Sequence, residues 1–164
     1  MDSDCDGYTS ASLLLNYLHR IFPATVENNV TYSLHPNKHH GIVLEDIPEG
    51  VKLIIAPDSS SNESDIHLLL QEHGIHTIVL DHHQADKNDI DPAIIVNNQM
   101  SDYLNKDLSG VGIVYKFCKI LDKIFHVSYA DNYLDLVSLG NCADMMDLHS
   151  PETHYYIVEG AKNI

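Results

Sequence analysis

The sequence predicts an α/β domain in which a mostly parallel β-sheet is flanked by helices. Three short apolar runs, at residues 51–56, 77–80 and 93–96, have the length and aliphatic composition of buried strands. Segments with helical spacing of apolar residues lie before, between and after these runs. Strands that alternate with helices favour parallel pairing, because each crossover returns the chain to the same end of the sheet.

The first part of the chain carries one helix pattern and one short strand pattern. Between Thr9 and Phe22, apolar residues recur at the spacing of one helix face; they are Ala11, Leu14, Leu15, Leu18 and Ile21. Residues 26–32 are predicted as a short strand. The polar, turn-rich segment 35–41 is predicted as a loop.

The middle of the chain alternates strands and helices, and its first two strands end in an acid. The strand at 51–56 ends at Pro57-Asp58, and the strand at 77–80 ends at Asp81. Residues 59–64 can cap a helix that runs to about Glu72, and Gly74 suits the position just after its end. The third strand, at 93–96, leads into Asn97-Asn98.

The last part of the chain is predicted to be helical. Residues 111–125 share one apolar face over several turns, which predicts a long helix. Leu134, Val137 and Leu148 are assigned to further helical material, and residues 152–162 to a last helix. By length the 164 residues form one domain.

An α/β domain normally begins with a strand, whereas this chain begins with an Asp-rich loop. We therefore expect that a first strand, ending near Met1, is missing from the sequence.

Composition and charge exclude or disfavour several classes of protein. Twenty-four acids against nine bases give a net charge of −15, with a single arginine, Arg20. Such a surface repels polyanions, so a module that binds duplexes by neutralising phosphates is disfavoured. The sequence has no apolar run of roughly 18 residues, and it opens on no signal-peptide pattern, so no membrane association is expected. Three cysteines without metal-binding spacing favour a reducing compartment and predict a cytoplasmic protein.

Acidic and histidine residues gather where a parallel sheet places its functional sites, beyond the carboxyl ends of the strands. They are Asp2-Ser3-Asp4-Cys5-Asp6-Gly7, Asp58, Asp81-His82-His83 and Asp144. A single acid after a strand is more often a turn former or a helix cap. Several carboxylates at one edge repel one another, and a divalent cation relieves that repulsion. Carboxylates with imidazole suit manganese or magnesium.

These residues resemble the motifs of the DHH family of phosphoesterases. Asp2-x-Asp4-x-Asp6-Gly7-x-Thr9-Ser10 is similar to the first motif, Pro57-Asp58 to the second, and Asp81-His82-His83 to the motif that names the family. Three further segments resemble the RecJ branch: 35–41, 96–98 with 108–117, and 134–144. The resemblance extends over essentially the whole chain, in order.

The resemblance implies a two-metal phosphodiester hydrolase and, specifically, the catalytic domain of a single-stranded DNA exonuclease. It implies two divalent cations, Mn²⁺ with Mg²⁺ as the alternative, held by five ligands: Asp4, Asp6, Asp58, His82 and Asp144. Asp58 would bridge the ions, and Asp81 would be a ligand or would orient the histidines. His83 would face the scissile phosphate. The substrate contacts would come from Asn37, Lys38, Ser109 and Gly110.

The sequence differs from the family pattern in two respects, and two other functions are compatible with it. The family's first motif usually includes a histidine that would precede Met1, and the family's second, substrate-gripping domain is absent from these 164 residues. One alternative is a phosphoesterase for small substrates such as oligoribonucleotides, cyclic dinucleotides or pyrophosphate. The other is a non-catalytic binding scaffold that keeps the fold but has lost its metals. The oligomeric state is not predicted.

Overall fold

The computed structural model describes residues 3–34, 41–86 and 90–164. In chain order the elements are α1 (Cys5–Ile21), α2 (Pro23–Asn29), the 3-10 helix η1 (Leu44–Asp46), β1 (Leu53–Pro57), α3 (Ser64–Glu72), β2 (His76–Asp81), β3 (Ile94–Asn97), α4 (Gly110–Phe125), the 3-10 helix η2 (Ala130–Tyr133), α5 (Leu134–Ala143) and α6 (Pro151–Ala161). None of the described helices combines the length and apolarity needed to cross a membrane.

The predicted parallel sheet is confirmed. Its three strands lie in the order β1-β2-β3, and both pairings are parallel. In the register, Pro57 is opposite Leu80 and Asp81 is opposite Asn97. All three strands therefore end at one edge of the sheet, and the residues that follow them lie close together.

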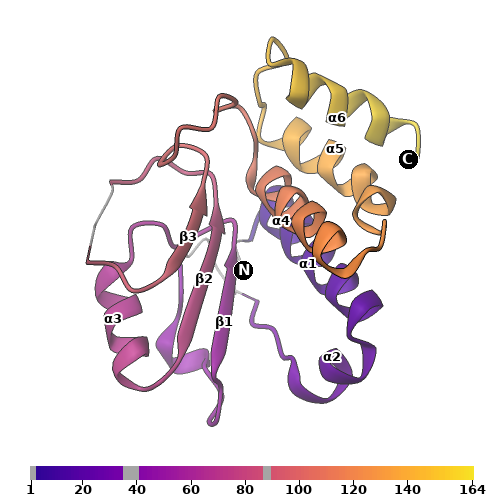
Figure 1. The fold of residues 1–164 in the computed structure, drawn as a ribbon. Helices are drawn as coiled ribbons and strands as arrows, with labels where there is room; N and C mark the ends of the chain where they lie inside the picture. Colours follow the sequence, from indigo (N-terminus) through magenta and orange to yellow (C-terminus); the bar gives the residue numbers. More distant parts are fainter. Residues whose placement is uncertain (1–2, 35–40, 87–89) are drawn as a thin grey trace.

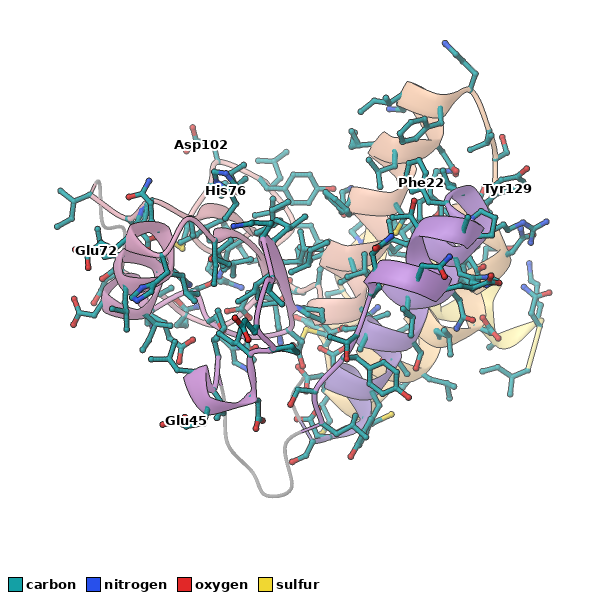
Figure 2. The ribbon with its side chains drawn as sticks, turned by 90° about the horizontal axis from the view of Figure 1, so that it is seen from below. Phe22, Glu45, Glu72, His76, Asp102 and Tyr129 are labelled. Carbon is teal, nitrogen blue, oxygen red and sulfur yellow. The ribbon has the colours of Figure 1, made fainter. Side chains whose placement is uncertain are left out.

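Helices cover both faces of this sheet (Figure 1). Helix α3 lies on one face, whereas α1 and α4 lie on the other. Helix α5 packs on α1 and α4 away from the sheet, and α6 packs on α5. Figure 2 shows the same division from below, with Glu72 of α3 on one side and Phe22 and Tyr129 among the helices of the other.

The core fills the space between the sheet and the α1–α4–α5 layer. Its fully buried members include Leu13, Leu80, Val111, Val114 and Val137, which come from four different elements. Each such side chain contributes about 1.5–3 kcal/mol through its removal from water. This packing fixes the position of α1 and α4 relative to the strand ends.

Two local predictions are wrong. Residues 26–32 do not form a strand: α2 occupies residues 23–29, and the chain becomes extended at Val30. Pro23 stands in the first turn of α2, where its fixed φ favours a helix and its missing N–H costs nothing. Leu148 lies in a turn between α5 and α6 and not in a helix. The helix predicted at 152–162 is confirmed as α6.

A half-buried carboxylate ties α6 to α4 and to the loop before α4. Glu152 accepts hydrogen bonds from the hydroxyls of Tyr103 and Tyr156, from Asn105 Nδ2 at 2.9 Å and from Lys116 Nζ at 2.6 Å. Burial alone would raise the pKa of Glu152, but these hydrogen bonds, first that from Lys116, lower it to about 2.

We expect Glu152→Gln to lower the free energy of unfolding at pH 7 by about 1–3 kcal/mol, because it leaves Lys116 without its charged partner. The depressed pKa stabilises the fold above the ordinary value of 4.5, and this stabilisation is lost as the pH falls toward 2. Urea denaturation at several pH values should therefore show the difference between wild type and variant shrinking in acid. Glu159→Gln is the matched control, because among the described residues the Glu159 side chain pairs with exposed Lys162, which directly follows α6. An equal loss in both variants would contradict the prediction.

Candidate metal centre

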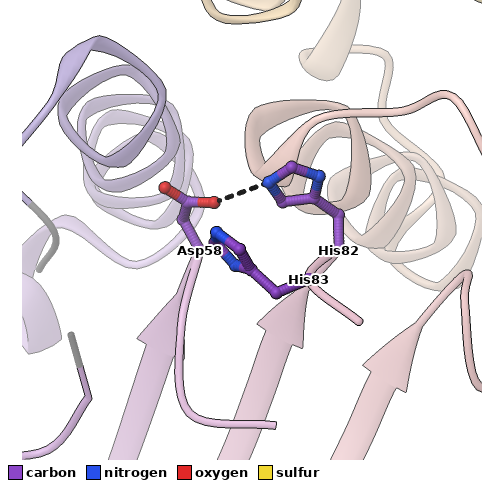
Figure 3. A group of neighbouring side chains, drawn as sticks. All are labelled: Asp58, His82 and His83. Atoms are coloured by element: carbon purple, nitrogen blue, oxygen red, sulfur yellow. Dashed lines mark ion pairs between the residues drawn. The ribbon is translucent and has the colours of Figure 1, made fainter. Parts of the chain in front are cut away.

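The carboxyl edge of the sheet gathers the predicted acids and histidines. Asp58 follows β1, and His82 and His83 follow β2. Figure 3 shows the side chains of all three converging beyond the ends of the two strands. The first turn of α1 adds Asp6, and the end of α5 adds Asp144. Five residues from four separate elements thus meet at one place.

The imidazole of His82 lies at the centre of three carboxylates. Its Nε2 is 3.2 Å from Asp144 Oδ2, 3.3 Å from Asp58 Oδ1 and 3.6 Å from Asp6 Oδ2. Two groups of three side chains place their donor atoms close enough to hold a cation: Asp6, His82 and Asp144, and Asp58, His82 and His83. Four of the five predicted metal ligands therefore lie together.

Asp6 is held by the beginning of α4. Its carboxylate is buried and accepts hydrogen bonds from the backbone N–H of Gly110 at 2.6 Å and of Val111 at 3.1 Å. The N-terminus of a helix has unpaired N–H groups, and two of them are satisfied here by the carboxylate of Asp6. The helix end therefore fixes the position of one predicted ligand.

The carboxylate of Asp81 accepts hydrogen bonds from neighbouring groups of the chain. Its Oδ1 accepts from His82 N at 2.7 Å and from the His83 ring nitrogen Nδ1 at 2.7 Å, and its Oδ2 accepts from Ser61 N at 3.1 Å. Burial opposes ionisation, but the hydrogen bonds from His83 and Ser61 hold the pKa of Asp81 well below its usual range. In turn, Asp81 raises the pKa of His83. This geometry favours an orienting role for Asp81 over direct ligation.

The side chain of Asp58 is buried, and its Oδ1 atom accepts no hydrogen bond from the described residues, although His82 Nε2 lies 3.3 Å away. Burial and the neighbouring charge of Asp6 raise the pKa of Asp58 well above its ordinary value. The backbone of Asp58 has a φ of +61°, in the left-handed region that non-glycine residues rarely adopt. A buried carboxylate with an unpartnered oxygen, facing a second carboxylate and an imidazole, fits a divalent cation.

The remaining predicted site residues lie outside the two groups of donor atoms. Asp4 is exposed, caps α1 by accepting from Gly7 N at 2.9 Å, and belongs to neither group of donor atoms. Asn37 and Lys38 lie outside the described residues. The backbone N–H of Ser109 donates a hydrogen bond to Asn141, and that of Gly110 donates to Asp6. The substrate contacts predicted for these two residues stay a prediction.

Several residues that shape the site carried no assigned role in the sequence. A Cβ at Gly140 would lie 2.5 Å from Asp6 Oδ1, so α5 packs directly against this ligand. Asn141 is fully buried and accepts from Ser109 N at 3.2 Å. Ser61 and Asn97 bond the segment that carries Asp81 and His83. Two sequence signals pointed to Asn97: its place directly after a predicted strand, and its position in the segment 96–98 that resembles RecJ.

The fold and the site agree with the protein family whose sequence model matches this chain. Residues 1–141 match the model of the "DHH family, N-terminal domain". The match includes every residue of the cluster except Asp144, and it covers all three strands. The chain belongs to the DHH family.

Individual proteins of the family resemble this chain in sequence and in structure. The chain is 43% identical, over its whole length, to the SPbeta prophage-derived protein YorK of Bacillus subtilis, named as a single-strand DNA-specific exonuclease. It is 29% identical over 90% of its length to the single-stranded-DNA-specific exonuclease RecJ of Bacillus subtilis. A crystal structure of exonuclease RecJ bound to manganese superposes with a TM-score of 0.76, at 25% identity, over 96% of this chain and 40% of that one. The chain spans only 28% of YorK and 19% of the Bacillus RecJ.

Proposed function

We propose that this chain forms one catalytic domain of a metal-dependent exonuclease that hydrolyses phosphodiester bonds of single-stranded DNA. The observation that carries the proposal is the cluster of buried Asp6, Asp58 and His82 with partly exposed Asp144 at the carboxyl edge of the sheet. The names of the relatives, which are single-strand-specific exonucleases, support the substrate. The family's manganese-bound structure supports the choice of metal.

In this proposal Asp4, Asp6, Asp58, His82 and Asp144 hold two divalent cations, with Mn²⁺ preferred and Mg²⁺ as the alternative. Carboxylates suit both ions, whereas the imidazole of His82 favours Mn²⁺. When bound, such a pair supplies a hydroxide at neutral pH and stabilises charge on the phosphate oxygens. The chain's own contribution is to fix the carboxylates in place, as the two N–H groups at the start of α4 do for Asp6.

His83 is the proton donor of the proposed reaction. Its ring is half exposed, and Asp81 fixes it through Nδ1 at 2.7 Å, so Nε2 is the nitrogen that can face the substrate. The hydrogen bond to Asp81 raises the pKa of His83 above its ordinary value, because Asp81 stabilises the protonated ring. A protonated His83 donates its Nε2 proton to the leaving oxygen and stabilises the negative charge that develops there.

One observation favours a smaller substrate. Three of the described lysines, Lys116, Lys119 and Lys162, are already paired with carboxylates. The described part of the chain therefore offers few cations to a long strand. A DHH phosphoesterase that cleaves dinucleotides or other small phosphodiesters is the second candidate. The non-catalytic scaffold is disfavoured, because the acids of the cluster are all present and converge.

The proposal is tested by cleavage of end-labelled single-stranded DNA by the full chain with Mn²⁺, beside a duplex and a dinucleotide of the same sequence. We expect mononucleotides to be released from the single strand, faster than from the duplex, and no release in the presence of EDTA. Faster cleavage of the dinucleotide than of the strand would favour the second candidate. A protein that binds no Mn²⁺ by metal analysis and cleaves none of the three would favour the scaffold.

A further inference from the structure

Asn97 joins the ends of all three strands. Its side chain is 4% exposed and has a partner for each of its polar atoms. Nδ2 donates to Ser61 Oγ, in the turn after β1, and to the carbonyl oxygen of His83, after β2, both at 2.9 Å. Its Oδ1 accepts from Gln99 N at 2.8 Å, in the segment after β3 itself.

Two routes lead from this side chain to His83. The direct route is the hydrogen bond to the His83 carbonyl, which fixes the peptide that follows the strand. The second route runs through Ser61, whose backbone N–H donates to Asp81 Oδ2 at 3.1 Å, and Asp81 in turn holds the His83 ring. Because Asn97 lies opposite Asp81 in the β2–β3 register, both routes are short.

We propose that Asn97 is a positioning residue that sets the direction of the His83 ring toward the scissile phosphate. This inference rests on the proposed function, in which His83 donates a proton. An amide is needed at this position, because two donors and one acceptor are used at once and an isosteric carboxylate offers no donor. In this proposal Asn97 acts through the position of His83 and not through direct contact with the substrate.

The neighbouring residue offers a matched control. Asn98 is also buried, at 3% exposed, but its Nδ2 donates to Asn105 O at 3.1 Å, in the segment that leads toward α4. Asn97→Asp and Asn98→Asp therefore make the same chemical change, at adjacent buried positions, and only the first lies on the routes to His83. A similar loss of activity in both variants would indicate a general loss of stability and not a change in the position of His83.

The experiment measures kcat and KM on the substrate that the full chain cleaves, for Asn97→Asp, Asn98→Asp, His83→Ala and the double variant Asn97→Asp/His83→Ala. We expect Asn97→Asp to lower kcat by roughly 10–100-fold with little change in KM, and Asn98→Asp to leave kcat within about threefold. In the His83→Ala background Asn97→Asp should change kcat by less than about twofold, because residues that act as a unit are not additive. Mn²⁺ binding, followed by the EPR signal of the free ion, should be retained in Asn97→Asp.

If Asn97→Asp does not fold, Ser61→Ala takes its place in the cycle, because it deletes one acceptor of Asn97 and leaves the Ser61 N–H in place. Additive losses in the double variant, or equal losses in Asn97→Asp and Asn98→Asp, would overturn the inference and leave the proposed function standing. Equal rates for wild type and His83→Ala would instead remove the proposed role of His83, and the inference with it. A wild-type chain without Mn²⁺-dependent cleavage would reject the proposed function itself.

Discussion

Replacing Asp58 by asparagine is expected to abolish metal-dependent cleavage and to stabilise the metal-free protein. Asparagine has the same shape but no charge, so it would hold the proposed cations poorly. The loss of about 4 kcal/mol of transition-state stabilisation corresponds to about a thousandfold in rate. The measurement is the initial rate of single-strand cleavage at saturating Mn²⁺.

The gain in stability has a separate cause. Burial and the charge of Asp6 hold the pKa of Asp58 above its ordinary value of 3.8, so the metal-free fold loses stability as the pH rises above that value. The neutral amide of the Asp58→Asn variant would carry no such cost, and we expect this variant to be more stable by about 1–3 kcal/mol in urea at pH 7 in EDTA. Added Mn²⁺ should stabilise the wild type and leave the variant unchanged.

Asp65→Asn is the control for this substitution, because Asp65 is an exposed residue in the first turn of α3, away from the cluster. It should change neither the rate nor the response to Mn²⁺. An Asp58→Asn protein that still cleaved at a tenth of the wild-type rate would show that Asp58 holds no essential cation.

The second large effect is expected from Gly110→Ala. A Cβ at Gly110 would lie 2.6 Å from Asp58 Cγ and 2.7 Å from Asp58 Cβ, so the whole side chain of Asp58 must move. Gly110 also donates its N–H to Asp6, and a shift of this helix end moves a second ligand. A displacement of about 1 Å costs about a hundredfold in rate, and we expect at least that loss of kcat.

Gly112→Ala is the matched control, because it lies in the same first turns of α4. There the three atoms nearest to a Cβ all belong to the Leu108 side chain, at 3.1–3.6 Å, so a shift of that side chain by a few tenths of an ångström accommodates it. Alanine is also about 1 kcal/mol better than glycine in a helix, so this variant should fold well and keep its activity. Weaker Mn²⁺ binding by Gly110→Ala, in isothermal titration, should accompany its loss of rate. Equal activity of the two variants would contradict the close approach of Gly110 to Asp58.

The class of the fold and the residue types of the site could be predicted from the amino-acid sequence. Apolar runs report burial directly, so the strands at 51–56, 77–80 and 93–96 were predicted within one or two residues of β1, β2 and β3. Parallel order then required Asp58 and Asp81-His82-His83 to meet at one edge, as they do. The strand predicted at 26–32 failed because a short apolar pattern does not distinguish a strand from a helix, and Pro23 favoured the helix.

The contacts that hold the site in place depend instead on how distant segments pack together. Asp6 bonds Gly110 across 104 residues of sequence, and no local pattern encodes which helix end meets which acid. The same is true of Gly140 against Asp6 and of Asn97 between Ser61 and His83. Periodicity describes which face of a segment is buried, whereas these contacts require the relative placement of separate segments. That placement is set by the packing of α1, α4 and α5 on the sheet, which the core determines as a whole.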